Sequence, residues 1–262
     1  MRPRPRVLIT GATGGVGELL TERLQNSYDL ALTDIRIPKP TPTLPFVEAD
    51  VASLESMRAA CQGIDVVVHL AADPRPDAPW ESLLPNNIIG TYNVFQAAHE
   101  AGCSRIIFAS SVNTVLGYSP DVPVSANLPV RPPNLYGATK VWGETLARYY
   151  SDSSNISCVC LRIGWVKDPH NLGLPPGDPR LHFVITHGDL VKLIVASIEA
   201  PSNLGFGVFH GISNNRHRQF DIGEARRILG FEPTDDAFAL AEATSLRPKP
   251  RGWNQLVSWL RK

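Results

Sequence analysis

Short apolar runs alternate with amphipathic stretches along the first part of the chain. Apolar and β-branched residues dominate the runs that we predict to be strands, at 6–10, 29–34, 46–49, 64–70, 105–109 and 156–161. Apolar residues recur at helical spacing in the stretches that we predict to be helices, at 16–24, 54–61, 83–101 and 136–150. This alternation predicts an α/β fold with a doubly wound parallel sheet. Such sheets bind ligands at the carboxyl ends of their strands.

The alternation weakens beyond Arg162. Residues 165–182 are rich in proline and glycine. The pattern there indicates only short elements, at 190–198, 208–209, 221–229 and 253–260, the last of which is typical of a closing helix. We therefore predict two regions, with residues 1–162 as the core that carries the reactive residues. Residues 163–262 are predicted to be mainly a small C-terminal substrate-binding lobe with closing helices.

Composition narrows the classes of function. The chain has 262 residues, with 25 Lys and Arg against 25 Asp and Glu, so its net charge is zero. No electrostatic excess favours nucleic acid or an anionic membrane, and we expect neither as a partner. The apolar run behind the basic N-terminus, residues 7–9, is too short for a signal peptide or a membrane span. We expect a cytoplasmic protein.

The cysteines and histidines do not indicate a metal site. Cys61, Cys103, Cys158 and Cys160 lack the paired spacing of zinc ligands, and the seven histidines form no HExxH motif. We predict reduced thiols in the core and no bound metal.

A glycine-rich turn joins the first predicted strand to the first predicted helix. Gly11, Gly14 and Gly17 form a GxxGxxG pattern there. A turn from strand to helix needs a positive φ angle, and glycine lets the backbone approach a pyrophosphate without a Cβ atom in the way. The free N–H groups at the start of the next helix favour phosphate. We therefore predict a dinucleotide-binding, Rossmann-type core in residues 1–162, with cofactor contacts from Gly11, Thr13, Gly14, Gly15, Val16 and Gly17.

An acidic residue follows the glycine turn at the distance expected for a ribose-binding carboxylate. Asp34 ends the second predicted strand, twenty positions after Gly14, and its carboxylate can accept hydrogen bonds from both ribose hydroxyls of adenosine. Because it would repel a 2′-phosphate, we expect NAD as the cofactor, with NADP less favoured. Arg36 is close enough in sequence to stack on adenine or to hold that phosphate. Later strand ends add four predicted contacts of adenine and its ribose, Asp50, Val51, Ala71 and Ala72.

A tyrosine and a lysine are spaced for acid–base chemistry. Tyr136 and Lys140 form a YxxxK pattern in a predicted helix, where this spacing puts two side chains on one face. A phenol with a pKa of about 10 is a poor base at neutral pH, but an adjacent ammonium group and a positive nicotinamide ring favour the phenolate. The pattern follows the fifth predicted strand, which leads into Ser110 and Ser111.

These motifs occur together in a known family, because the chain resembles extended members of the short-chain dehydrogenase/reductase superfamily. The matching segments are 10–17, 87–91, 110–111, 136–140, 161–163 and 229–233. The resemblance implies that Ser111 orients the substrate oxygen and that Tyr136 is the catalytic acid–base. It also implies that Lys140 lowers the pKa of the tyrosine and holds the nicotinamide ribose, and that Asn87 assists from the central helix.

Within that superfamily the chain is similar to the compact uronate dehydrogenases, which oxidise C1 of a hexuronic acid to a lactone with NAD. The similarity rests on length and on residues 108–111, 135–137, 162–164 and 187–189. It implies that the Tyr136 phenolate takes the proton of the anomeric hydroxyl while hydride passes from C1 to the nicotinamide. We expect an NAD-dependent oxidoreductase acting on CH–OH, a sugar 1-dehydrogenase for an acidic aldose such as a uronate or another anionic sugar.

The substrate-binding segments depart from the uronate dehydrogenase pattern. Those enzymes have Asn-His directly after the second serine, where this chain has residues 112–114, and a serine where this chain has Trp165. Predicted substrate contacts are Ser111, Asn113, Trp165, Lys167, His170 and Arg180. Asn113 fits a contact with sugar hydroxyls, and Trp165 fits either stacking on a pyranose or a core position. The last three fit either an anion clamp or solvated loop residues.

Other functions share this fold. A nucleotide-sugar epimerase would use the same Ser, Tyr and Lys, but the stretch after Lys140 is short for a lobe that must also hold a nucleoside diphosphate. A dehydratase needs a carboxylate near Ser111, and residues 112–114 offer none. A non-catalytic NAD-binding regulator would not need the reactive set. A dehydrogenase consumes added NAD, an epimerase recycles a tightly held one, and a regulator does neither.

Two predicted helices carry apolar residues on more than one face. The stretches that begin at Leu83 and at Tyr136 have more apolar positions than one contact with the sheet needs. They include Val94, Phe95, Ala98, Val141, Trp142, Leu146 and Tyr149. We expect the second face to pair across a two-fold axis in a homodimer or a higher homo-oligomer, an arrangement that the resemblance also implies.

Overall fold

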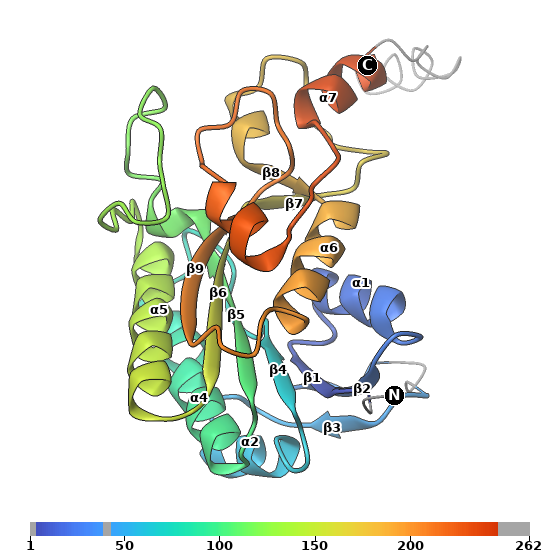
Figure 1. The fold of residues 1–262 in the computed structure, drawn as a ribbon, viewed down its shortest axis with the longest axis vertical. Coiled ribbons are helices and arrows are strands. Elements are labelled where there is room, and N and C mark those ends of the chain that lie inside the picture. The colour runs from blue at the N-terminus through green and yellow to red at the C-terminus, as the bar shows by residue number, and fades with distance from the viewer. Residues whose placement is uncertain (1–3, 39–42, 246–262) are drawn as a thin grey trace, which may run out of the picture.

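A seven-stranded parallel sheet forms the centre of the protein in the computed structural model, which describes residues 4–38 and 43–245 (Figure 1). Its strands are β1 Arg6–Thr10, β2 Asp29–Asp34, β3 Phe46–Glu48, β4 Val66–His69, β5 Arg105–Ser111, β6 Ser157–Ile163 and β9 Phe206–Gly211. Their spatial order is β3-β2-β1-β4-β5-β6-β9. The order reverses between β1 and β4, which is the switch point where doubly wound sheets bind ligands. The predicted fold class is confirmed.

Helices cover both faces of the sheet. They are α1 Gly15–Leu24, α2 Leu54–Ala60, α3 Trp80–Leu83, α4 Gly90–Glu100, α5 Leu135–Ser153, α6 His187–Ile198 and α7 Ala237–Ser245. Figure 1 shows α1 and α6 on one face and α2, α4 and α5 on the other. Among the described residues, none of the helices has the length and apolar content needed to cross a membrane.

Alternation along the buried strands divides the core into two layers. On β1, Val7 and Ile9 pack with the α1 and α6 layer, whereas Leu8 packs with the layer of α2, α4 and α5. Each strand is therefore apolar on both faces, which explains the nearly unbroken hydrophobic runs in the sequence. The predicted core thiols are buried and free, namely Cys61, Cys103, Cys158 and Cys160.

The long helix predicted at 83–101 is interrupted. A π-helical segment, Leu84–Ile89, separates α3 from α4. Pro85 at its start lacks a backbone donor, so a regular α-helical ladder does not run through this segment. The side chain of Asn87 is buried within it. The prediction of helix was right, but that of one continuous helix was wrong.

The C-terminal part contributes more to the sheet than the sequence pattern indicated. The short strand predicted at 208–209 is β9, which pairs with β6 as the seventh strand, and α6 packs in the same core layer as α1. Residues 163–245 therefore supply core elements as well as a lobe. The helix predicted at 221–229 spans residues 223–229, of which Ala225–Leu229 are π-helical. The closing helix predicted at 253–260 lies outside the described residues.

A small parallel sheet forms the lobe beyond the carboxyl ends of the central strands (Figure 1). It consists of β7 Trp165–Lys167, which follows β6 almost directly, and β8 Val184–Thr186. A 3₁₀ turn, Pro179–Phe183, precedes β8. Apolar residues of this lobe pack against α7. These strands were not predicted, because three residues are too few to show an alternating pattern in a segment rich in proline and glycine.

Candidate active site

A cavity of about 580 Å³ lies at the carboxyl ends of the central strands. The ends of β5 and β6, the loop after β4 and the start of α5 border it, and β7 and the 3₁₀ turn close it from the C-terminal part. Its lining includes Val16, Ala72, Pro74, Ser111, Asn113, Tyr136, Lys140, Trp165, Arg180 and Phe183. This is the place in which a doubly wound sheet binds its ligands.

The glycine turn leaves room for a close backbone approach. Gly11 has a φ angle of 71°, and a Cβ atom there would lie 2.8 Å from the backbone nitrogen of Ala71. A Cβ atom at Gly17 would lie 2.2 Å from the carbonyl oxygen of Gly11. Gly14 is the N-cap of α1 and has no side chain to occupy the free N–H groups of the helix start. The turn therefore fits a bound pyrophosphate, and Val16 beside it lines the cavity.

Asp34 ties the end of β2 to the glycine turn. Its Oδ2 accepts a hydrogen bond of 3.0 Å from the backbone N–H of Thr13, and its Oδ1 accepts one of 2.8 Å from that of Ile35. The residue is half-buried, whereas Arg36 is exposed. A carboxylate in this place suits a ribose next to the turn, and an exposed guanidinium two residues away can still approach it.

The remaining predicted cofactor contacts lie in different surroundings. Ala71 lies against the glycine turn, and Ala72 lines the cavity. Asp50 is exposed, with its Oδ1 accepting a local backbone hydrogen bond. Val51 is buried in the core layer of α2 and α4. The structure therefore brings the two alanines to the site and leaves Val51 in the packed core.

Ser111, Tyr136 and Lys140 converge on the cavity. The Nζ atom of Lys140 lies 5.6 Å from the centroid of the Tyr136 ring and 5.0 Å from that of Phe108. Burial raises the pKa of Tyr136, and its hydrogen bond with Ser111 acts in the opposite direction. Burial also lowers the pKa of Lys140 to about 8. The three side chains have the chemistry of a buried acid–base, its supporting cation and a hydroxyl.

Thr10 and His69 support the switch point next to Lys140, and neither was predicted as a site residue. Thr10 Oγ1 accepts hydrogen bonds of 3.2 Å from the backbone N–H groups of Leu70 and Ala71 and lies 2.8 Å from His69 Nδ1. Burial, and then the charge of Lys140, lower the pKa of His69 to about 3, so the imidazole is neutral. The signal for this pair in the sequence is that each of two neighbouring strands ends in a polar residue. Thr10 ends β1 and His69 ends β4, and the two residues pair in register.

Asn87 holds a loop of the site and does not line the cavity. Its Oδ1 accepts a hydrogen bond of 2.8 Å from the backbone N–H of Asp73, and its Nδ2 donates one of 3.1 Å to the carbonyl oxygen of the same residue. Nδ2 also donates to Thr139 Oγ1 at 3.1 Å. These bonds fasten the loop after β4, which carries Ala72 and Pro74, to α5. The described contacts of Asn87 are those of a positioning residue, and its assistance to the reaction stays a prediction.

Asn113 lines the cavity, but its side chain is already engaged. Its Nδ2 donates a hydrogen bond of 3.1 Å to Ser111 Oγ, and its Oδ1 accepts one of 3.0 Å from Asn134. Asn134 was not predicted as a site residue. Its signal in the sequence is its place directly before the helix of Tyr136, where asparagine is a favoured N-cap.

The C-terminal part supplies the opposite wall. Trp165 lines the cavity, with Lys167 Nζ 3.8 Å from its ring centroid and the guanidinium carbon of Arg180 5.0 Å away. Arg180 also lines the cavity and forms an ion pair of 2.7 Å with Asp178. His170 is exposed in a turn and is not among the lining residues. The structure therefore gathers Trp165, Lys167 and Arg180 and leaves His170 apart.

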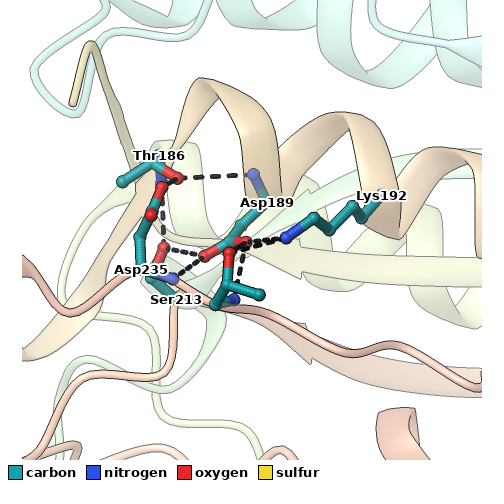
Figure 2. A network of polar contacts seen from close by, with 6 residues as sticks. Thr186, Asp189, Lys192, Ser213 and Asp235 are labelled. Atoms are coloured by element: carbon teal, nitrogen blue, oxygen red, sulfur yellow. Dashed lines mark hydrogen bonds and ion pairs between the residues drawn. The ribbon is translucent and has the colours of Figure 1, made fainter. Parts of the chain in front are cut away.

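A buried aspartate supports this wall (Figure 2). Asp189 lies in the first turn of α6 and is fully buried. Its carboxylate accepts hydrogen bonds from distant segments, at 2.8, 2.9 and 3.0 Å, from Ser213 Oγ and the backbone N–H groups of Thr234 and Asp235. Ser213 in turn donates its backbone N–H to Val184 at 2.9 Å, and Val184 pairs with Trp165 between β7 and β8. Asp189 thus connects α6 to the cavity wall.

A second buried network holds α5 in place along the strands. The Glu144 carboxylate accepts a hydrogen bond of 2.6 Å from Ser110 and bonds of 2.9 and 2.8 Å from Nε and Nη2 of Arg162. Ser110 and Arg162 are paired in register on β5 and β6. Glu144 lies one helical turn after Lys140 on α5, so this buried pair sets the helix against the strand that ends in Ser111.

The fold and the site together define a dinucleotide-dependent enzyme of the extended short-chain dehydrogenase/reductase type. A glycine turn with an acidic strand end and a buried Ser, Tyr and Lys set border one cavity at the switch point. The chain belongs to the NAD dependent epimerase/dehydratase family, which matches residues 7–181.

Relatives span nearly the whole chain. It is 36% identical over 252 residues to an NAD-dependent glucose-6-phosphate dehydrogenase of Haloferax volcanii, a match that covers 88% of this chain and 94% of the relative. It is 34% identical over 252 residues to a uronate dehydrogenase of Pseudomonas putida, covering 95% and 91%. The crystal structure of uronate dehydrogenase from Agrobacterium tumefaciens is similar with a TM-score of 0.83 at 35% identity, covering 95% of this chain and 91% of that one.

Proposed function

We propose that the protein is an NAD-dependent dehydrogenase that oxidises C1 of an anionic aldose to the lactone. The observation that carries the proposal is the convergence of Ser111, Tyr136 and Lys140 on a cavity beside the glycine turn. The relatives, named as a glucose-6-phosphate dehydrogenase and a uronate dehydrogenase, support a sugar as the substrate. Both resemble this chain over most of their length.

Each reactive side chain has one task in this reaction. The glycine turn and Asp34 would hold NAD, which when bound would supply the acceptor for the hydride of C1. The Tyr136 phenolate takes the proton of the anomeric hydroxyl. Lys140 stabilises the phenolate, which offsets the burial that raises the pKa of this phenol. Ser111 donates a hydrogen bond to the reacting oxygen and holds it next to the phenol.

The charges around the cavity favour an anionic substrate. The charged residues among the described lining residues are Lys140 and Arg180, and none of the lining residues is acidic. The ion pair of Arg180 with Asp178 uses Nε and Nη2, which leaves Nη1 for a substrate carboxylate or phosphate. Lys167 beside Trp165 adds a second positive charge to the same wall. We therefore place the anionic group of the sugar at this wall, away from the reacting C1.

A substrate panel tests this function. The purified protein is mixed with NAD or NADP and with hexuronates, sugar phosphates, sulfonated sugars and neutral aldoses, and the absorbance of NADH is followed. We expect steady NADH formation with an anionic aldose and a lactone as the product by mass spectrometry. Neutral aldoses should have a KM at least about tenfold higher, because they lose one charge-assisted hydrogen bond. Preference for a neutral aldose would contradict the anion site.

The same panel separates the competing functions. A nucleotide-sugar epimerase would interconvert nucleotide sugars without net NADH formation from added NAD, and a regulator would bind NAD without changing any sugar. Epimerisation of a nucleotide sugar, with no oxidation of free sugars, would refute the proposed dehydrogenase.

We also propose that the protein assembles through α4 and α5. Large apolar side chains on the outer faces of this helical pair are exposed, with 42% for Tyr92, 38% for Trp142 and 62% for Tyr149. Exposed aromatic residues gathered on neighbouring helices are typical of an interface. A symmetric pairing of this face would bury them in a homodimer.

A further inference from the structure

A chain of side-chain hydrogen bonds joins the start of α5 to Ser111. The backbone N–H of Gly137 donates to Asn134 Oδ1 at 2.7 Å. Asn134 Nδ2 donates to Asn113 Oδ1 at 3.0 Å. Asn113 Nδ2 donates to Ser111 Oγ at 3.1 Å. We refer to Asn134, Asn113 and Ser111 as the amide chain.

The direction of every bond in the amide chain follows from its first member. The backbone N–H of Gly137 can only donate, so Asn134 must turn its oxygen toward it and its NH₂ group toward Asn113. Asn113 must then accept with its oxygen, which leaves its NH₂ group to face Ser111. A reversal of either amide would place two donors or two acceptors against each other.

The amide chain leaves the Ser111 hydroxyl only one role. Its Oγ accepts a hydrogen bond from Asn113 Nδ2 and another of 3.2 Å from the backbone N–H of the same residue. These two donors occupy both lone pairs of the oxygen. The hydroxyl hydrogen must therefore be donated elsewhere, and Ser111 faces the cavity together with Tyr136.

Close packing holds the two ends of the amide chain together. A Cβ atom at Gly137 would lie 2.4 Å from the carbonyl oxygen of Asn113, so the first turn of α5 sits directly on the turn that follows β5. That turn, Val112–Thr114, is a 3₁₀ turn capped by Ser111. The helix that carries Tyr136 and the strand end that carries Ser111 are thus registered against each other through Asn113.

We propose that Asn113, oriented by Asn134, is a positioning residue that makes Ser111 an obligatory hydrogen-bond donor to the reacting oxygen. The proposal rests on the proposed function. A serine without these two donors can rotate its hydrogen and accept as readily as it donates. A fixed donor favours the oxygen as it gains negative charge during proton transfer, because the donor does not have to reorient.

A double-mutant cycle with Ser111→Ala tests the proposal. In the wild-type background, Asn113→Ala should lower kcat about tenfold, with the sugar KM and the NAD Kd changed less than about twofold. In the Ser111→Ala background, the same substitution should cause no further loss, because the hydroxyl that it orients is absent. A similar loss in both backgrounds, or no loss in either, overturns the proposal.

Two more variants separate positioning from folding. Asn134→Ser keeps a favoured N-cap for α5 but is too short to reach Asn113, so the melting temperature should stay near that of the wild type while kcat falls. Asn113→Asp keeps an acceptor for Asn134 but offers Ser111 a carboxylate, which draws the hydroxyl hydrogen away from the reacting oxygen. Its loss of kcat should exceed that of Asn113→Ala, and the excess should vanish with Ser111→Ala. A milder loss for Asn113→Asp contradicts the proposal.

A titration without sugar distinguishes failure of this proposal from failure of the proposed function. The absorbance of the protein minus that of Tyr136→Phe reports the ionisation of Tyr136. Among the described residues, Lys140 on α5 and Asp73 on the loop after β4 lie near this phenol, and Arg180 lines the same cavity. Asn113→Ala replaces none of these charged groups. The pKa of Tyr136 should be higher in Asn113→Ala than in the parent, since the Ser111 donor is no longer fixed. An unchanged pKa overturns the proposal whatever sugar the enzyme oxidises.

Discussion

Lys140 is held where a positive charge is costly. It is buried between the rings of Phe108 and Tyr136, and burial lowers its pKa from 10.5 to about 8. A folded-state pKa below the unfolded value means that the unfolded chain binds more protons between these two values. The contribution of this group to stability is therefore least favourable below about pH 8 and improves as the pH rises toward 10.5.

Replacing this lysine should stabilise the protein while it abolishes activity. We expect Lys140→Met to raise the free energy of unfolding by about 1–3 kcal/mol at pH 7, since the buried charge is removed without a change in length. Urea denaturation at pH 7 and at pH 10 measures the difference. The gain should be smaller at pH 10, and a gain that is equal at both values would contradict the assigned cause.

The phenol of Tyr136 should be needed for turnover and not for cofactor binding. Tyr136→Phe removes only the proton acceptor, so NADH formation should fall below detection while NAD binds with an unchanged Kd by calorimetry. Tyr28→Phe is the matched control, because Tyr28 is also buried but donates to Glu199, away from the site. Full activity of Tyr136→Phe would remove the assigned base.

Asp34 should set the preference for NAD. Asp34→Ala removes the ribose acceptor and the repulsion of a 2′-phosphate, so the Kd for NAD should rise about tenfold or more while that for NADP changes less. Asp50→Ala, which removes an exposed carboxylate that is not among the residues lining the cavity, should alter the ratio of the two constants little. An unchanged ratio in Asp34→Ala would show that another residue, such as Arg36, decides the preference.

In the C-terminal part, β7 lines the cavity, and hydrogen bonds hold its partner strand β8 to α6. Ser213 links Asp189 to β8 through three hydrogen bonds, made by its Oγ with Asp189 and Thr186 and by its N–H with Val184. Ser213→Ala should lower the free energy of unfolding by about 1–3 kcal/mol, because it removes the acceptor of the buried Thr186 N–H and one of the donors to the buried Asp189 carboxylate.

This substitution should act on the sugar and not on NAD. We expect Ser213→Ala to raise the sugar KM while the NAD Kd stays constant, since Val184 pairs with Trp165 on the wall and the glycine turn lies elsewhere. Ser197→Ala on the same helix is the control, because the hydrogen bond of that buried hydroxyl within the described part of the chain goes to Leu193 of α6. Equal effects of the two variants on the sugar KM would show that the wall does not depend on Ser213.

At the scale of the whole molecule, the exposed aromatic face of α4 and α5 predicts a dimer. Light scattering at micromolar concentration should give twice the mass of one chain, and Trp142→Glu with Tyr149→Glu should give a single chain, because two charges would be buried at the interface. Val47→Glu, at the exposed edge strand β3, should leave the dimer intact. A wild-type protein of single-chain mass would refute this assembly.

The pattern of residues along the chain was enough to predict the parallel sheet and the glycine turn. It was also enough to single out Asp34 and the pair of Tyr136 and Lys140. The sheet, the turn and the pair follow from the hydrophobic period of strands and helices, the positive φ of a turn and the spacing of one helical turn. Asp34 follows from its place at the end of the second strand, twenty positions after Gly14. The amphipathic spacing also showed that Trp142 and Tyr149 are more than a single buried face requires.

Contacts across the fold decided the rest. The pattern alone did not reveal the burial of Asn87 in a π-helix, the place of β9 as the seventh strand, or the separation of His170 from the wall. The Asp189 carboxylate and the amide chain bring together segments more than twenty residues apart. Residues so far apart meet only after the chain has packed, and the loss of backbone entropy that brings them together is offset by the whole core.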